Sequence, residues 1–345
     1  MRFSLLRLQE AVFVSGTERN KAMAKRGNLM TFREDVRVVD ATIRDGGLCN
    51  NFYFTDEFVR DLYKANQEAG VDYMEFGYKA SADLFDPEEF GKWKFCRDED
   101  IYDIVGDNDT DLKIAVMADV GRTNYKRDIV ERSNSPIDLI RVATYINTMP
   151  AAIEMIEYCA KMGYETTCNI MAVSKARKED IEAALDMVGE SPANAVYLVD
   201  SYGALYPEEI SVMSELYLEH MDKYGKQVGI HAHNNQMLAF ANTIEACSVG
   251  VSMLDATMNG MGRGAGNCML EQLLGFLKNP RYQLPPVLRF LEKNMDKLRE
   301  EGIQWGYNTA YLLTGRLNMH PRSAISFTKE NRQDYARFYL DLDQE

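Results

Sequence analysis

Apolar runs rich in β-branched residues alternate with amphipathic segments through most of this chain. Segments whose apolar positions recur every three or four residues are typical of helices, and they lie at 56–69, 151–162, 178–188, 207–223 and 236–249. The apolar runs are predicted to be β-strands at 36–42, 71–77, 112–118, 139–144, 165–172, 195–200, 228–233 and 251–256. Thr55 and Pro207, each followed by two acidic residues, are expected to start helices.

Eight strands that alternate with helices predict the fold class. Strands that are apolar on both faces belong to parallel sheets covered by helices, and eight such units in about 240 residues fit an α/β fold, the (β/α)₈ TIM barrel. An open doubly wound sheet is the alternative. We expect a poorly ordered N-terminal extension at 1–35, a catalytic barrel at 36–283, and a C-terminal helical appendage at 284–345 that packs beside the barrel.

Composition narrows the classes of partner. The chain has 53 acidic and 39 basic side chains, a net charge of −14, and no basic run, which argues against nucleic-acid binding. Its six cysteines are scattered, as expected for reduced thiols in a cytoplasmic protein. No apolar run reaches the roughly 18 to 20 residues that a membrane helix needs.

The first candidate for chemistry is the stretch VVDATIRDGG at 38–47. Arg44 and Asp45 are expected just past the first strand, at the barrel end where catalytic groups gather. Gly46 and Gly47 would let the backbone turn away sharply. A surface ion pair of little energetic value is the simpler interpretation of Arg44 and Asp45 alone.

A histidine pair strengthens the functional interpretation. In GIHAHNN at 229–235, His231 and His233 are two positions apart on a predicted strand, so both rings point to the same face. With Asp45 they would form a two-histidine, one-carboxylate metal site with open positions for substrate and water. This ligand set suits Mn²⁺, Mg²⁺, Co²⁺ or Zn²⁺, and it also occurs in non-haem iron oxygenases.

Two further features belong to the predicted barrel mouth. MNGMGRGAGN at 258–267 follows the last strand, so it is not a dinucleotide-binding turn, and its Asn267 could reach the metal or cap the next helix. Glu75 lies near the end of the second strand, and a carboxylate buried in a barrel is costly without a role. Glu75 is therefore expected to be catalytic or to pair with Arg44.

Together TIRDG, HAHNN and GRGAGN resemble the metal-dependent lyase and aldolase superfamily, which includes hydroxymethylglutaryl-CoA lyase and isopropylmalate synthase. VDSYGAL at 199–205 and WGYNTAYLLTG at 305–315 resemble its 4-hydroxy-2-oxovalerate aldolase branch. The resemblance implies a divalent metal, Mn²⁺ above all, held by Asp45, His231 and His233, with Asn267 as a further ligand. It also implies that Arg44 stabilises an enolate, that Ser201 holds the pyruvyl carboxylate and that Tyr307 donates or shields a proton.

The chain departs from that branch at one position. The branch has a histidine two residues after its RDG motif, and Leu48 stands there in this chain. Breaking the carbon–carbon bond requires a base at the 4-hydroxyl group, so another residue would have to serve. The candidates are Cys49, Asn50, Asn51, Tyr53, Lys79 and His320.

The favoured function is a divalent-metal-dependent aldolase or lyase that passes through a pyruvate enolate and acts on a 4-hydroxy-2-oxo acid. A Claisen-type acyl-CoA lyase or synthase on the same barrel, or a catalytically silent metal-binding homologue, is the alternative. The expected partners are a 2-oxo acid and an aldehyde, further copies of the chain in a homo-oligomer, and, as the resemblance implies, an aldehyde dehydrogenase. The sequence does not specify the aldehyde.

Overall fold

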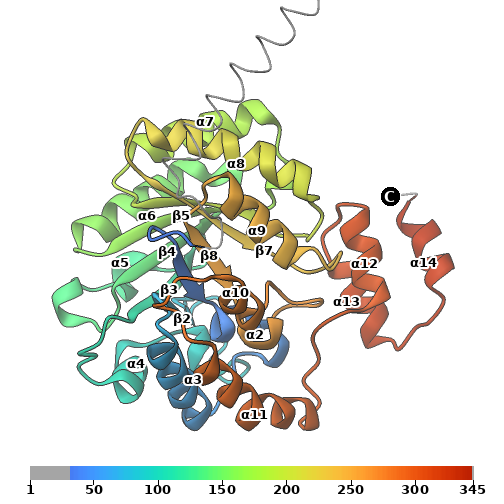
Figure 1. The fold of residues 1–345 in the computed structure, drawn as a ribbon, viewed down its shortest axis with the longest axis horizontal. Coiled ribbons are helices and arrows are strands. Elements are labelled where there is room, and N and C mark those ends of the chain that lie inside the picture. Colours follow the sequence, from blue (N-terminus) through green and yellow to red (C-terminus); the bar gives the residue numbers. More distant parts are fainter. Residues whose placement is uncertain (1–31, 344–345) are drawn as a thin grey trace, which may run out of the picture.

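The computed structural model describes residues 32–343, and eight parallel strands in it form a closed barrel in chain order (Figure 1). The predicted (β/α)₈ fold is confirmed. β1 closes the barrel by pairing with both β2 and β8. The strands are β1 Arg37–Asp40, β2 Tyr73–Tyr78, β3 Lys113–Asp119, β4 Leu139–Thr144, β5 Glu165–Ile170, β6 Ala195–Asp200, β7 Gln227–Ala232 and β8 Met253–Ala256.

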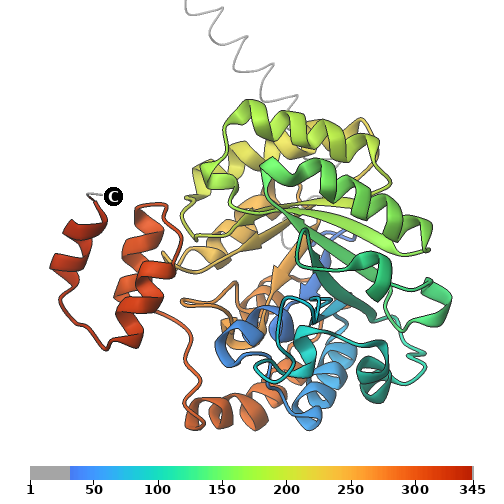
Figure 2. The ribbon, with the colours of Figure 1, turned by 180° about the vertical axis from the view of Figure 1, so that it is seen from behind.

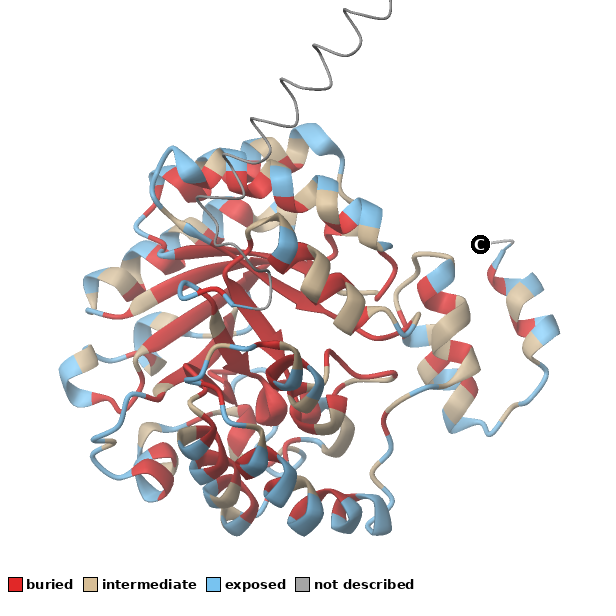
Figure 3. Ribbon diagram, in the orientation of Figure 1, coloured by how far each residue is buried: buried red, intermediate tan, exposed pale blue. Residues whose placement is uncertain are grey.

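Helices surround the barrel and turn their exposed faces outward (Figure 3). Thr55 caps α3 by accepting a hydrogen bond from the Phe58 amide at 3.2 Å, and Pro207 is the first residue of α8, as predicted. None of the helices within residues 32–343 is both long and apolar enough to cross a bilayer. The α-helices are α2 Thr42–Asn50, α3 Asp56–Ala69, α4 Asp98–Val105, α5 Tyr125–Asp128, α6 Met149–Lys161, α7 Lys178–Glu190, α8 Pro207–Asp222, α9 Ala239–Val249, α10 Leu270–Phe276, α11 Leu284–Glu300, α12 Thr309–Arg316, α13 Arg322–Lys329 and α14 Tyr335–Leu342.

The hydrophobic core has an inner and an outer layer. The larger outer cluster lies between the strands and the surrounding helices. The smaller inner cluster fills the barrel and consists of Val39, Tyr73, Ala115, Leu139, Ala195, Tyr197, Val199 and Met253. Because apolar side chains fill this part of the interior, the polar groups of the barrel gather nearer the carboxyl ends of the strands.

The segment after β1 differs from the prediction. The strand ends at Asp40, whose carboxylate accepts a hydrogen bond from the Thr42 amide at 3.0 Å, and helix α2 begins at Thr42. Gly46 and Gly47 therefore continue a helix, and the predicted sharp turn at these glycines is wrong. They allow close packing instead, since a Cβ atom on Gly46 would meet the Met261 side chain and one on Gly47 would collide with the Phe52 ring.

The C-terminal region has two parts. α11 packs against α3 beside the barrel. α12, α13 and α14 share a separate apolar cluster around Ala324 and Phe327 and stand at the carboxyl ends of the strands (Figures 1 and 2). Hydrogen bonds from Asn318 Nδ2 to the Ser174 carbonyl oxygen at 2.9 Å and from Asn235 Nδ2 to the Tyr311 carbonyl oxygen at 3.4 Å join them to the barrel loops.

The predicted N-terminal extension, residues 1–35, lies mostly outside the described residues. In the part that is described, the side chain of Arg33, which precedes β1, is buried. Its guanidinium donates to the carbonyl oxygens of Cys247 at 2.7 Å and Val251 at 3.0 Å. These bonds tie residue 33 to the last turn of α9 and to the segment that leads into β8.

The contact between Gly47 and Phe52 generates a stability prediction. Gly47→Ala should lower the free energy of unfolding by about 1–3 kcal/mol, because the added methyl group has no room beside the ring. Gly275→Ala is the matched control, since its Cβ atom would meet only Leu284 Cδ2, at 3.9 Å. Urea unfolding measures both variants. Equal stability of Gly47→Ala and wild type would contradict the packing role.

Candidate active site

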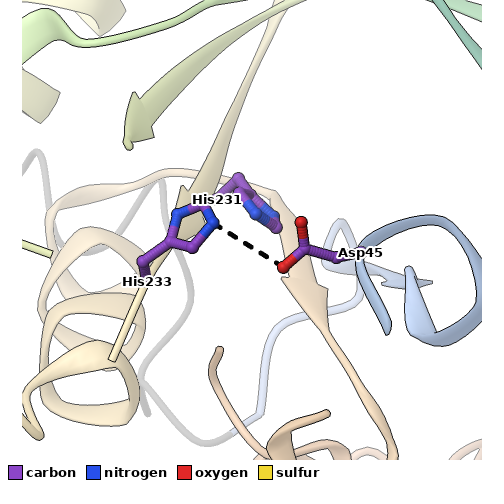
Figure 4. A group of neighbouring side chains, drawn as sticks. All are labelled: Asp45, His231 and His233. Carbon is purple, nitrogen blue, oxygen red and sulfur yellow. Dashed lines mark ion pairs between the residues drawn. The ribbon is translucent and has the colours of Figure 1, made fainter. Parts of the chain in front are cut away.

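Three predicted metal ligands meet at the carboxyl end of the barrel (Figure 4). Asp45 comes from α2, His231 from the end of β7, and His233 from the residues that follow. One ligand atom from each of the three buried side chains lies within 4.8 Å of the others, and His233 Nε2 is 3.6 Å from Asp45 Oδ2. The three residues are therefore close enough to hold one metal ion.

The hydrogen bonds of the two histidines leave the same ring atom free. His231 Nδ1 is 2.9 Å from Asp255 Oδ2, and His233 Nδ1 is 3.1 Å from the carbonyl oxygen of Asp200. If each Nδ1 donates its proton, each Nε2 carries a lone pair, and neither of these buried Nε2 atoms has a hydrogen-bond partner within residues 32–343. Burial lowers the pKa of His233 to about 3, which keeps its ring neutral. The neutral ring of His233 and the two buried Nε2 atoms that face the cluster fit a divalent metal.

Asn267 lies beside this cluster. Its Nδ2 donates to Asp45 Oδ2 and, at 3.2 Å, to the Met261 carbonyl oxygen, while its buried Oδ1 has no hydrogen-bond partner among the described residues. The backbone of Gly262 passes so close that a Cβ atom there would collide with Asn267 and Asp45. Asn267 is thus placed either to orient Asp45 or to act as a further ligand.

A chain of alternating charges crosses the barrel below the cluster. Arg44 donates to Asp45 at 2.8 Å and through Nε to Glu75 at 2.8 Å. Glu75 also accepts from Arg141 at 2.9 Å, and Arg141 donates to Asp255 at 2.7 Å. All five side chains are buried. The expected pairing of Glu75 with Arg44 is present.

Sequence reasoning missed Arg141 and Asp255. Each is a charged residue inside a strand whose other residues are largely apolar, LIRVAT in β4 and MLDA in β8. A charge at such a position needs a buried partner of opposite charge, so these two residues could have been predicted from the sequence to form buried ion pairs. Only the closed barrel shows that Arg141 pairs with Glu75 and Asp255, and that Asp255 contacts His231 of the candidate metal site.

The charges also set the state of Asp45. Burial by itself would raise the pKa of this carboxyl group, but the positive groups around it, Arg44 foremost, together outweigh burial and hold the pKa well below its usual range. Asp45 is therefore ionised at neutral pH, as a metal ligand must be.

A cavity of about 80 Å³ opens at the cluster. Three larger cavities, of about 530, 640 and 400 Å³, lie on the outside of the barrel, and none is lined by any of the three candidate ligands. The volume of the site cavity is far below the roughly 300–1,000 Å³ of pockets that bind drug-sized ligands, which indicates a small substrate. It is lined by Arg44, Asp45, Leu48, Tyr78, Met117, Ala143, Tyr145, Asn169, Met171, Val199, Ser201, Tyr202, His231, His233, Arg263 and His320.

Ser201 and Tyr307 have different positions relative to this cavity. Ser201 lines it, and its Oγ accepts a hydrogen bond from the Ala172 amide at 2.9 Å, which leaves the hydroxyl proton free to be donated. Tyr307 is 60% exposed and does not line it. Tyr78, Tyr145 and Tyr202 are the tyrosines of the cavity wall.

Most candidates for the missing base lie away from the cavity. Leu48, at the position where the resemblance implies a histidine, lines the cavity. Asn50, Asn51 and Tyr53 do not. The Cys49 thiol donates to the Gly262 carbonyl oxygen at 3.1 Å, and burial raises its pKa to about 12, so it stays protonated. Lys79 is ion-paired with Asp98 beside the outer hollow of 530 Å³.

His320 is the candidate that reaches the cavity. It lies between α12 and α13, and its ring packs edge-on against Tyr202 with centroids 5.8 Å apart. Burial and the nearby charges of Arg263 and Arg322 lower the pKa of His320 to about 4, so the ring is neutral at pH 7. Its Nδ1 accepts from the Arg322 amide at 3.2 Å, which places the proton on Nε2.

The barrel and its Asp-His-His group define a TIM-barrel protein with a candidate divalent-metal site at the catalytic end. A family model described as HMGL-like matches residues 35–290. The chain therefore belongs to the HMGL-like family.

Individual relatives agree with the family. The chain is 30% identical over 252 residues to a 4-hydroxy-2-oxovalerate aldolase of Pelotomaculum thermopropionicum, a match that covers 72% of each chain. It is 27% identical over 248 residues to an oxaloacetate decarboxylase of Mycobacterium tuberculosis, covering 72% of this chain and 71% of the relative. The N-terminal domain of a putative aldolase from Bacteroides vulgatus has a similar structure, with a TM-score of 0.73 and 27% identity over 85% of this chain and 96% of that one.

The contact between Asp255 and His231 generates a prediction about metal affinity. Asp255→Asn should weaken Mn²⁺ binding about 10–100-fold, because the carboxylate orients the ring and makes its Nε2 more basic. Asp186→Asn is the matched control, since Asp186 contacts His220 Nδ1 at 3.0 Å outside the site. Isothermal titration calorimetry measures both affinities. Unchanged affinity in Asp255→Asn would refute the role of the Asp255 carboxylate.

Proposed function

We propose that this chain is a divalent-metal-dependent aldolase that makes or breaks a carbon–carbon bond next to a 2-oxo acid through a pyruvate enolate. Its enzyme class is that of the aldolase relatives, the carbon–carbon lyases. The observation that carries the proposal is the Asp45, His231 and His233 group beside the Arg44 guanidinium in a cavity for a small substrate. A 4-hydroxy-2-oxo acid is the proposed substrate class.

Asp45, His231 and His233 would hold the metal, with Mn²⁺ favoured and Asn267 as orienting group or further ligand. A bound divalent ion supplies Lewis-acid polarisation of the 2-oxo group. Arg44 lines the same cavity and adds a fixed positive charge where the enolate oxygen develops negative charge. Glu75 accepts from Arg44 Nε and so holds the guanidinium in place.

Two other residues would position the substrate. Ser201 can donate its hydroxyl proton to the carboxylate of the 2-oxo acid, because its oxygen already accepts from the Ala172 amide. His320 presents a neutral Nε2–H group, which suits a hydrogen bond to the aldehyde oxygen during bond formation. Tyr307, exposed and outside the cavity wall, has no part in the proposed reaction.

The oxaloacetate decarboxylase relative favours a second candidate, decarboxylation of a 2-oxo diacid. Decarboxylation of such an acid also forms a pyruvate enolate, so the same metal group and Arg44 would serve. Release of carbon dioxide from oxaloacetate separates this candidate from the aldolase. Turnover of an acyl-CoA ester would instead support the Claisen-type alternative.

Exchange of the pyruvate methyl protons in D₂O tests the enolate step without an aldehyde. The Mn²⁺-loaded protein should exchange these protons for deuterium. Samples are quenched and freed of Mn²⁺, and proton NMR then measures the loss of the methyl signal. Asp45→Ala should lose metal and exchange together. Arg44→Lys should keep the metal but slow exchange about 10²–10³-fold, because lysine cannot reproduce the placed guanidinium.

Asp186→Asn serves as the matched control for folding and metal loading, and circular dichroism checks each variant. Absence of metal-dependent exchange in the wild type would sink the proposed pyruvate enolate chemistry. Loss of metal from Arg44→Lys as complete as from Asp45→Ala would refute the separate roles of the two residues.

A further inference from the structure

Arg263 is the cavity-lining arginine without a carboxylate partner. Arg44 pairs with Asp45 and Glu75, and the buried Arg141 below it pairs with Glu75 and Asp255. For Arg263, within residues 32–343, the structure has no ion pair; its guanidinium donates to the Ser201 carbonyl oxygen at 2.9 Å. In a chain with 14 more acidic than basic side chains, an unpaired guanidinium at a cavity indicates a site for an anion.

The loop that carries Arg263 is held in place from two sides. Gly264 packs so closely under Tyr311 of α12 that a Cβ atom would collide with the ring. The Gly264 carbonyl oxygen accepts a hydrogen bond from the Gly306 amide at 3.1 Å. Contact with the C-terminal region therefore fixes the loop whose Arg263 guanidinium donates to the Ser201 carbonyl oxygen.

The charges of the metal site are balanced without Arg263. Asp45, Glu75 and Asp255 carry three negative charges, and Arg44 and Arg141 carry two positive ones, which leaves one negative charge. A divalent cation changes this excess to one positive charge, and the single carboxylate of a 2-oxo acid neutralises it. The charge of Arg263 remains for a second anionic group.

The neighbours of Arg263 on the cavity wall also favour an anion. His320 is neutral and presents Nε2–H, and Tyr202, whose ring contacts His320, can donate from its hydroxyl group. Arg322, exposed at the start of α13, adds a positive charge at the rim. Hydrogen-bond donors and positive charge thus meet at this side of the cavity.

We propose that Arg263 forms an acceptor subsite, and that the aldehyde carries a carboxylate or phosphate group which this guanidinium binds. The inference rests on the proposed aldolase function and deepens it by naming the class of acceptor. A cavity of about 80 Å³ restricts that acceptor to a short chain.

Matched aldehydes test this subsite with the Mn²⁺-loaded full-length chain and pyruvate. Propanal is compared with 4-oxobutanoate, and glyceraldehyde with its 3-phosphate, so that the two pairs distinguish a carboxylate from a phosphate. In at least one pair kcat/KM should be about tenfold or more higher for the charged aldehyde. Arg263→Ala should remove that preference, and Arg263→Lys should retain part of it.

Arg316→Ala is the control, because Arg316 is exposed at the end of α12 and lies outside the cavity wall, so the preference should persist. Proton exchange of pyruvate is measured in every variant. Exchange in the wild type without preference for either charged aldehyde would overturn the subsite alone, whereas absence of exchange would overturn the aldolase function and the subsite together. If Arg263→Ala slowed exchange as much as addition to the charged aldehyde, Arg263 would belong to the 2-oxo acid end and the proposal would be wrong.

Discussion

The structure of the site depends on the buried chain of charges that runs from Asp45 through Arg44, Glu75 and Arg141 to Asp255. Each charge is removed from water, which is costly unless an opposite charge lies within hydrogen-bonding distance. Each of the five side chains has such an oppositely charged partner. Its last carboxylate, Asp255, contacts His231, and its first, Asp45, belongs to the candidate ligand group, so the same contacts that make burial tolerable also hold these side chains in place.

Close backbone packing is the second constraint. The RDGG and GRGAGN segments approach each other so tightly that a methyl group on Gly46 would meet Met261 and one on Gly262 would strike Asp45. Glycine at these two positions allows the two segments to pack closely and is not needed for an unusual backbone conformation, since Gly46 lies within a helix and neither residue has a positive φ. The first and last units of the barrel can therefore contribute to one small cavity.

The C-terminal helices extend this cavity beyond the barrel itself. They bring His320 to the cavity wall, which Leu48 also lines. Their contact with Gly264 also holds the loop that carries Arg263. The side of the cavity that contains Arg263 is therefore built jointly by loops of the barrel and by the C-terminal helices.

The sequence by itself determined the barrel and the ligand group, because strand and helix periodicities are local and a two-residue spacing places His231 and His233 on one strand face. Local patterns could not show that Asp45 lies on a helix, nor which buried charges pair across the barrel. Nor could they show that His320 reaches the cavity while Tyr307 stays outside it. Those features depend on contacts between residues far apart in the chain, and only barrel closure and the docking of the C-terminal helices decide them.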